Sequence, residues 1–286
     1  NMSYLAKVYD YLIRNNYSRD CVIFGVGGGI TCDMTGFIAS TFLRGVDFVL
    51  VPTTLLSQVD ASIGGKTGVN HKGFKNMIGT FNQPVQVIID TKFLKSLSKL
   101  EIQCGLMEVI KHGLISDKVF FVWLEKNLKQ ILSLKPKFIE RAIKRSIEIK
   151  ADVVSKDEKE NGLRAILNFG HTFGHALETI GNNKLYTHGE AVALGMLAAT
   201  KLSENISDLD PKVFDRVHST IKNTGIKVKL KKKIFPKKLI KLMQSDKKKN
   251  NSQLKFILLE KIGKAKIKSV SNEVTIENAI KNSLFY

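Results

Sequence analysis

The sequence predicts an α/β amino-terminal domain followed by a mainly helical carboxy-terminal domain. Up to about residue 90, short apolar and β-branched runs alternate with helical patterns, and this alternation is typical of a parallel sheet with crossover helices. Beyond Thr91 helical patterns dominate, and only one short strand pair is expected. A chain of 286 residues is long enough for two domains and a large core. We place the boundary after residue 97, which gives domains at 1–97 and 98–286.

The first domain begins with an amphipathic helix over residues 2–15, because apolar side chains recur there at helical spacing: Leu5, Val8, Tyr9, Leu12 and Ile13. Residues 21–26 (CVIFGV) form a buried-strand pattern, and three glycines at 27–29 lead into a helix over 30–43. This order presents backbone N–H groups and a helix N-terminus to a phosphate. The spacing is not GxGxxG, so a tight turn that simply needs glycine is an alternative interpretation.

Strands at residues 48–51 and 85–90 follow, separated by an unusually long stretch of polar residues and glycine. Long irregular segments in a compact domain tend to be functional. This one carries Asp60, Lys66, Lys75 and Asn76 among glycines that let the backbone approach a ligand. In a parallel sheet, ligands bind in the crevice at the carboxyl ends of the strands.

The second domain is predicted to contain several helices and one hairpin. Helices are expected at residues 101–116, 119–132, 137–154, 212–223, 235–244 and 272–282, besides two that carry the histidines described next. The hairpin is expected at residues 254–259 and 265–269, joined by EKIGK. We find no internal repeat.

A candidate metal site lies in RAILNFGHTFGHALETIGNNKLYTHGE, residues 164–190. His171 and His175 are four residues apart in a helical pattern, so both rings project from one face. His188 follows a polar break and begins a second helical run, so two helices meeting at their ends would bring His171 and His188 together. A catalytic zinc site usually has three protein ligands and one open position. Glu108 is the candidate for the third ligand.

An ordinary explanation competes with this one, because an isolated HxxxH pair is more often a surface or core pair. Asn168 and Gly170 favour the metal site, since they precede the helix and can line a polar cavity; Glu190 favours it as a carboxylate beside the third histidine. Lys111 and His112 share a helix face with Glu108, where a surface salt bridge is the ordinary interpretation.

The net charge of +19 raises the possibility of a nucleic-acid partner. Much of the charge lies between residues 222 and 268, in runs such as KVKLKKK and DKKKNN. These lysines are not interleaved with stacking aromatic residues, as a single-strand binding groove requires. We therefore favour a solvated lysine-rich surface and expect no nucleic-acid partner.

The remaining composition indicates a cytoplasmic protein with no membrane partner. No apolar run approaches the length of a membrane span, and no secretory signal is visible. The three cysteines have no CxxC spacing, which fits a reducing compartment and argues against a disulfide framework or a thiolate metal site.

Seven motifs, in order along the chain, closely resemble the dehydroquinate synthase family: GGGITCDMTGF, RGVDFVLVPTTLLSQVDASIGGKTGVN, KNMIG, GLMEVIKHG, KDEKENGLRAILNFGHTFGHALE, HGEAVALGM and DKKKNNSQLKFILL. The match runs from the first helix to near the C-terminus. It implies a Rossmann-like NAD-binding domain, a mainly helical metal- and substrate-binding domain, and a homodimer.

The resemblance also implies a phosphate lyase that uses NAD and one divalent ion, usually zinc, with cobalt as an alternative. Such an enzyme converts 3-deoxy-D-arabino-heptulosonate 7-phosphate to 3-dehydroquinate in the shikimate pathway. The implied steps are transient oxidation by NAD, elimination of phosphate, return of the hydride, ring opening and an intramolecular aldol closure.

Residue by residue, the resemblance implies the following roles. The metal ligands are Glu108, His171 and His188. The substrate contacts are Arg44, Lys66, Lys75, Asn76, Lys150, Arg164, Asn168, His175 and Lys247, of which Arg44 matches an arginine that can reach a neighbouring subunit's site. The catalytic residues are Lys66, Lys111, His175, Asn168, Arg164, Lys150, Asp60 and Glu160. The NAD contacts are Gly28, Gly29, Asp33, Thr53, Thr54, Lys66 and Lys75. His112 matches no ligand position and is interpreted as structural or as a neighbour of the ligands.

The family has a further segment before residue 1, with the first strands of the Rossmann-like half and a motif that contacts the adenosine end of NAD. We therefore expect this chain alone to bind NAD weakly and to be less stable, because the sheet would expose an unpaired edge. Tight NAD binding in calorimetry would contradict this expectation.

Three alternatives stay open. Another sugar phosphate cyclase would share the metal and NAD sites but would differ in the groups that bind the substrate carboxylate, and Lys150, Arg164 and Asn168 argue against it. A metal-dependent alcohol or glycerol dehydrogenase would release NADH, and the lysine-rich phosphate pocket argues against it. A regulatory pseudoenzyme is disfavoured because no implied ligand or substrate residue is visibly lost.

Overall fold

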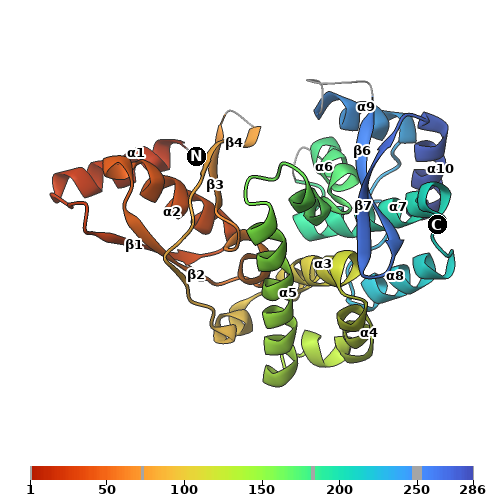
Figure 1. Ribbon diagram of the computed structural model, residues 1–286, viewed down its shortest axis with the longest axis horizontal. Coiled ribbons are helices and arrows are strands. Elements are labelled where there is room, and N and C mark those ends of the chain that lie inside the picture. The colour runs from red at the N-terminus through yellow and green to blue at the C-terminus, as the bar shows by residue number, and fades with distance from the viewer. Residues whose placement is uncertain (1, 72–73, 182–183, 247–252, 286) are drawn as a thin grey trace. The chain divides into compact units, whose positions relative to one another are not determined.

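A computed structural model describes residues 2–71, 74–181, 184–246 and 253–285, without the side chains of residues 74–75 and 245–246. The chain divides into two compact units, Asn1–Ile102 and Gln103–Tyr286, which run from red to yellow and from yellow to blue in Figure 1. The predicted fold class is confirmed, because the first unit holds a parallel sheet and the second is mainly helical.

The first unit is built on a parallel sheet. Strands β1 (Val22–Gly27), β2 (Asp47–Pro52) and β5 (Gln86–Val87) pair in the order β1-β2-β5. Helices α1 (Met2–Arg14) and α2 (Gly29–Thr41) begin and end within a few residues of their predicted bounds. The strand predicted at 85–90 is shorter, because only two of its residues pair with β2.

The core of this unit is shared by the two helices and β2. Leu5 and Leu12 of α1, Ile38 of α2, and Phe48 and Leu50 of β2 are all buried in one apolar cluster. Leu5 and Leu12 belong to the apolar stripe from which the helix was predicted. The same stripe is therefore the face of α1 that packs into the core.

The long stretch between β2 and β5 is not irregular, and that prediction was wrong. It contains a π-helical turn at Ser57–Ala61 and an antiparallel hairpin of β3 (Lys66–His71) and β4 (Phe74–Phe81), and a 3-10 turn at Thr91–Ser96 follows β5. Thr67 and Thr80 pair across the hairpin with their hydroxyl oxygens 2.8 Å apart. The hairpin was missed because its glycines look like loop residues, although they allow close packing: a Cβ at Gly79 of β4 would lie 2.1 Å from the carbonyl oxygen of Thr67 on β3.

The second unit consists of helices around one central helix. Its elements are α3 (Lys99–Ser116, whose first residues belong to the first unit), α4 (Lys118–Leu132), α5 (Pro136–Lys156), α6 (His171–Ile180), α7 (His188–Ser207), α8 (Lys212–Asn223), α9 (Pro236–Asp246), β6 (Leu254–Lys261), β7 (Lys264–Val270) and α10 (Glu273–Leu284). Nearly all apolar residues of α7 are buried, and this helix packs against α6, α8, α10 and β6 (Figure 1). None of the helices in the described part of the chain is long and apolar enough to cross a membrane.

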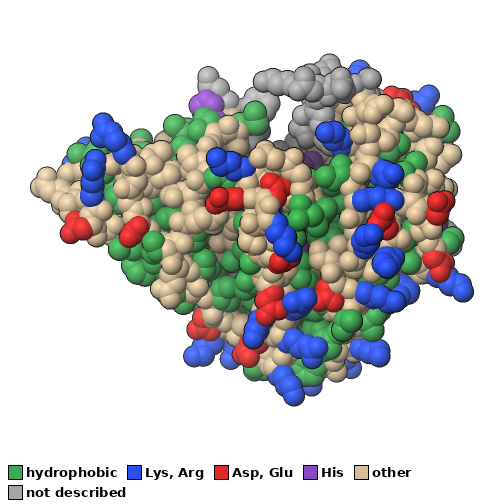
Figure 2. Space-filling model, in the orientation of Figure 1, with side chains coloured by type: hydrophobic (Ala, Val, Ile, Leu, Met, Phe, Trp, Pro, Cys, Tyr) green, Lys and Arg blue, Asp and Glu red, His purple; other side chains and the backbone are tan. Residues whose placement is uncertain are grey.

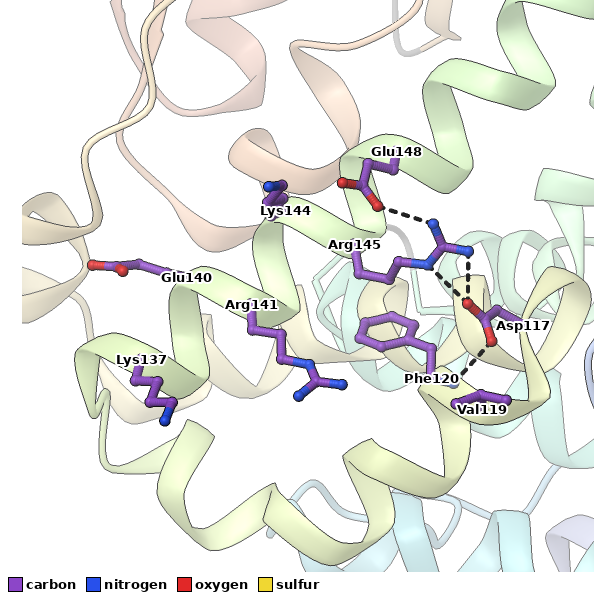
Figure 3. Close-up of a pocket in the computed structure, with 9 residues that line it drawn as sticks. All are labelled: Asp117, Val119, Phe120, Lys137, Glu140, Arg141, Lys144, Arg145 and Glu148. Carbon is purple, nitrogen blue, oxygen red and sulfur yellow. Dashed lines mark hydrogen bonds and ion pairs between the residues drawn. The ribbon is translucent and has the colours of Figure 1, made fainter.

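Asp117 ties the start of α4 to the middle of α5, beside a surface groove of about 680 Å³ (Figure 3). One carboxylate oxygen accepts the Phe120 N–H at 2.9 Å and caps α4. The other accepts from Arg145, at 2.8 Å from Nε and 2.7 Å from Nη2, and Arg145 also contacts Glu148 at 2.9 Å. One side chain therefore caps the start of α4 and also holds Arg145 of α5.

Asp117→Ala is expected to lower the free energy of unfolding by about 1–2 kcal/mol, because the N-cap is lost. The exposed Arg145 pair adds little, since exposed ion pairs contribute less than about 1 kcal/mol. Asp117→Asn is the matched control because its amide oxygen can still cap α4, so it should lose less. Urea unfolding of both variants measures this, and equal losses would contradict the capping role.

Candidate metal centre and active site

The structure brings Glu108, His171 and His188 together. Glu108 lies on α3 and is fully buried, while His171 and His188 are the first residues of α6 and α7. Oε1 of Glu108 is 3.8 Å from Nε2 of His171 and 3.6 Å from Nε2 of His188. One potential ligand atom from each of the three lies within 4.8 Å of the others. Two helices meeting at their ends do place both histidines at one point.

Local structure fixes the start of each histidine helix. Gly170 precedes His171 with φ of +80°, and a Cβ there would lie 2.7 Å from the backbone nitrogen of Met196. Thr187 precedes His188 and caps α7 in a reciprocal capping box with Glu190. The two imidazoles are thus placed by the backbone contacts at the ends of their helices.

The ring nitrogens that face away from Glu108 also have partners. Nδ1 of His171 lies 3.2 Å from the carbonyl oxygen of Phe169, and Nδ1 of His188 lies 3.4 Å from Oε1 of Glu178. With Nδ1 facing these oxygens, each ring turns Nε2 toward Glu108 and the candidate metal position.

The surroundings of Glu108 fit a divalent cation. Neither of its carboxylate oxygens accepts a hydrogen bond from a described residue, and its charged neighbour is Lys111, one turn along α3. A buried charge is costly unless it is paired or binds a metal. A carboxylate and two imidazoles are ligands of a borderline ion such as Zn²⁺, and three protein ligands leave a position open.

The three side chains have strongly shifted pKa values. Burial would raise the pKa of Glu108, but Lys111 and the two imidazoles outweigh it and hold that pKa well below its usual value. Burial, with Lys111, lowers the pKa of His171 to about 3. Burial opposes protonation of His188, yet the carboxylates of Glu108 and Glu178 on either side of its ring raise its pKa to about 9. A cation bound here must therefore displace the proton on His188.

Two features near the histidines were missed or misinterpreted from the sequence. Glu190, taken there as a sign of the metal site, bonds to Thr187 and pairs with Lys231 at 2.7 Å, and it is not part of the candidate ligand group. Glu178 was not singled out, although it lies seven residues after His171 and so on the same helix face. That spacing was the signal that could have found it.

The predicted substrate residues of the second unit surround the loop before α6. Lys150 and Arg164 are buried, with 6 % and 2 % of their surfaces exposed. The Arg164 guanidinium donates to the carbonyl oxygen of Glu158, and Asn168 donates to Glu160 at 2.5 Å. His175 is exposed, and its ring centroid is 5.4 Å from that of His171. Two buried cations and an accessible imidazole are residue types that suit an anionic ligand.

Asp157 holds this loop in shape. Its carboxylate accepts the backbone N–H groups of Asn161, Gly162 and Arg164 at 2.8–2.9 Å, and these bonds lower the pKa of Asp157. The stabilisation of this loop by the ionised Asp157 carboxylate is therefore fully present at pH values above the ordinary Asp pKa. It is lost as the pH falls through the lowered pKa of Asp157.

Asp157→Ala is expected to raise KM for the phosphorylated substrate that the sequence motifs imply by about tenfold, because three N–H groups lose their acceptor and Arg164 loses its fixed position. Asp157→Asn, which keeps one acceptor oxygen, should raise it less. Steady-state kinetics test this, with Asp152→Ala as a control at an exposed α5 carboxylate that pairs with Lys156. An unchanged KM in Asp157→Ala would contradict the role of the loop.

Four of the predicted NAD residues, Gly28, Gly29, Thr53 and Thr54, lie at the carboxyl ends of β1 and β2 in the first unit. Gly28 caps α2, and a Cβ on it would lie 3.2 Å from the Thr54 side chain. The N–H of Thr53 donates to the carbonyl oxygen of Gly27 at 2.8 Å, and Asn76 donates to Asp33 at 3.2 Å.

The other predicted residues of the first unit are more dispersed. Asp60 is half-buried in the π-helical turn, Lys66 begins β3 and is exposed, and Arg44 is exposed with φ of +70°. The side chain of Lys75 and the whole of Lys247 lie outside the described residues.

Positive charge is not collected into one patch on the face shown in Figure 2, where lysine and arginine side chains of the second unit are interspersed with acidic ones. The groove of Figure 3 lies between α4 and α5, and none of the predicted site residues lines it. The groove is therefore distinct from the candidate metal ligands Glu108, His171 and His188.

Together, the fold and the site define a class of protein with a parallel α/β unit and a helical unit that holds a candidate metal centre. The structure is similar to 2-epi-5-epi-valiolone synthase ValA from Streptomyces hygroscopicus, solved with NAD⁺ and Zn²⁺ bound (TM-score 0.90, 27 % identity, 99 % of this chain and 79 % of that one). It is also similar to a 2-deoxy-scyllo-inosose synthase complexed with carbaglucose-6-phosphate, NAD⁺ and Co²⁺ (TM-score 0.90, 27 % identity, 99 % and 80 %).

Sequence comparison identifies the family. Residues 1–104 match the 3-dehydroquinate synthase N-terminal family and residues 105–249 the C-terminal one. The chain is 47 % identical to the 3-dehydroquinate synthase of Nitrosomonas europaea, over 91 % of this chain and 70 % of that protein. It is 45 % identical to that of Thermoanaerobacter pseudethanolicus, over 94 % and 74 %. The chain belongs to the 3-dehydroquinate synthase family, as its motifs predicted.

Proposed function

We propose that this chain catalyses the family's reaction at a metal centre formed by Glu108, His171 and His188. The reaction converts 3-deoxy-D-arabino-heptulosonate 7-phosphate to 3-dehydroquinate and phosphate. The observation that carries the proposal is the convergence of one buried carboxylate and two Nε2 atoms within 4.8 Å, in a chain of this family. Two similar structures, solved with NAD⁺ and with Zn²⁺ or Co²⁺, support the choice of cofactors.

The residues of the second unit bind and orient the substrate. When bound, the metal polarises the substrate hydroxyl that is oxidised, and NAD takes up the hydride and later returns it. Lys150 and Arg164 neutralise the negative groups of the substrate, and Asn168, held by Glu160, offers its amide. The exposed imidazole of His175 moves a proton at the carbon next to the transient ketone.

The residues of the first unit bind the nucleotide and complete the substrate contacts. Gly28 and Gly29 bring the N-terminus of α2 to the pyrophosphate of NAD, with Asp33, Thr53 and Thr54 beside it. We assign Lys66, Lys75, Asn76 and Asp60 to the substrate and to the nicotinamide end of NAD. Lys247, in the second unit, is assigned to the substrate.

The assembly and location are part of the same proposal. The enzyme is a homodimer in which the exposed Arg44 reaches the partner's site. It is cytoplasmic, in keeping with three free cysteines.

Release of phosphate from the seven-carbon keto-acid phosphate tests the function directly. The assay uses the chain with NAD, with and without a chelator, and follows phosphate and NADH together. Release that the chelator abolishes, without net NADH, is the expected result, because the hydride is returned in each turnover. NADH accumulation on a simple alcohol would indicate a dehydrogenase, and release only from a sugar phosphate that lacks a carboxylate would indicate another cyclase.

A further inference from the structure

Glu178 is a buried carboxylate that the proposed reaction does not use. Only 5 % of its surface is exposed, and its neighbours on α6 include the buried apolar residues Ala176 and Leu177. Burying a carboxylate is costly unless it bonds to a donor. Oε1 of Glu178 lies 3.4 Å from Nδ1 of His188, on the side of the ring opposite Glu108. The contact with His188 is therefore the feature of Glu178 that bears on the metal centre.

Helix α6 supplies groups to both sides of the site. His171 and Glu178 are seven residues apart, which is two turns, so they share a face of α6. His171 is a candidate metal ligand, and Glu178 contacts the imidazole of the other candidate, His188. His171 has a different partner at its own Nδ1, the carbonyl oxygen of Phe169. The two rings are thus oriented by two independent oxygen acceptors.

We propose that Glu178 is a positioning residue for the divalent ion. Its carboxylate accepts the Nδ1–H of His188 and so fixes the ring orientation and the tautomer that leave the Nε2 lone pair facing the metal. The inference rests on the proposed metal site. Carboxylates in this position orient the imidazole and raise its basicity, and their loss typically costs about 10–100-fold in metal affinity.

The backbone at His188 is held by other contacts, so the role of Glu178 can be separated from folding. Lys231 pairs with Glu190, which caps α7 together with Thr187. Gly189 packs so closely on α3 that a Cβ there would lie 2.3 Å from Cα of Cys104. None of these contacts involves Glu178. Changing Glu178 should therefore release the ring of His188 and leave the start of α7 in place.

The test compares Glu178→Ala and Glu178→Gln with the wild-type chain. Zinc affinity is measured by competition with a chromophoric chelator, and the visible spectrum of the cobalt-loaded protein reports ligand geometry. We expect Glu178→Ala to weaken zinc binding by about 10–100-fold and to alter the cobalt spectrum. Glu178→Gln should weaken it less, because its amide oxygen still accepts the Nδ1–H of His188.

The matched control is Glu204→Gln. Glu204 is another poorly exposed carboxylate, with 13 % of its side chain accessible, and it pairs with Lys201 at 2.8 Å. It lies on α7 at about 24 Å from His188 along the helix axis. Zinc affinity and cobalt spectrum should match the wild type in this variant.

Three results would overturn the inference. Glu178→Ala could bind zinc as tightly as the wild type, Glu204→Gln could weaken binding equally, or nitrogen NMR of the zinc-loaded wild type could show Nδ1 of His188 coordinated rather than protonated. A wild-type chain that binds no zinc or cobalt would overturn the proposed metal site together with this inference, so the two failures are distinguishable.

Discussion

Replacing Glu108 by glutamine is expected to reduce phosphate release by about 10³-fold or more, because the divalent ion that stabilises charge in the transition state is lost. Glutamine has the same shape but carries no charge, and it leaves Lys111 buried beside two imidazoles without its counter-charge. An uncompensated buried charge typically costs about 3–5 kcal/mol of stability. Metal affinity and stability should therefore both fall.

His171→Ala separates the two effects, because it removes a ligand and keeps the Glu108–Lys111 pair. It should lose zinc and activity to a similar degree while remaining folded by circular dichroism. Glu140→Gln, at an exposed carboxylate of α5, serves as the control and should retain both. Activity in Glu108→Gln that matches the wild type at the same zinc occupancy would contradict the assignment.

Gly195→Ala is expected to lower the free energy of unfolding by about 3 kcal/mol or more, because overpacking here cannot relax easily. A Cβ at residue 195 would lie 2.0 Å from the carbonyl oxygen of Gly170 and 2.9 Å from the nitrogen of Gly174. Both are backbone atoms of the segment that begins α6, so no side chain can move aside. Alanine's better helix propensity returns only about 1 kcal/mol.

Asn205→Ala controls for the introduction of alanine into α7, since Asn205 is exposed on the same helix. It should leave stability unchanged or slightly higher in urea unfolding. Gly195→Ala should also weaken zinc binding, because residue 170 immediately precedes His171. Wild-type stability in Gly195→Ala would show that α6 and α7 do not approach as closely as described.

Periodicity in the sequence predicted the helices well, because a helix that buries one stripe must repeat its apolar residues. The bounds of α8 agree with the predicted range, and those of α1 differ by a single residue. The hairpin of β3 and β4 was missed for a physical reason. Its glycines and threonines look like loop residues. In the structure, however, they allow close contacts of the hairpin with α2 and of β3 with β4.

The candidate site could be predicted only in part. His171 and His188 were found because each stands at the start of a helical run. Their distance to Glu108 depends on how α3 packs against α7, through contacts such as Gly189 against Cys104, and no local pattern encodes such a contact. Glu190 was misinterpreted because adjacency to His188 cannot distinguish a capping carboxylate from one that faces the site.

X-ray absorption at the zinc edge of the zinc-loaded chain tests the central claim most directly. We predict two imidazole nitrogens and one carboxylate oxygen at about 2.0–2.2 Å, and one imidazole fewer in His188→Ala. A sulfur ligand at about 2.3 Å, or a spectrum that does not change in His188→Ala, would contradict it. Cys104 makes the first alternative meaningful, because its sulfur lies 3.2 Å from the hydroxyl of Thr187, next to His188.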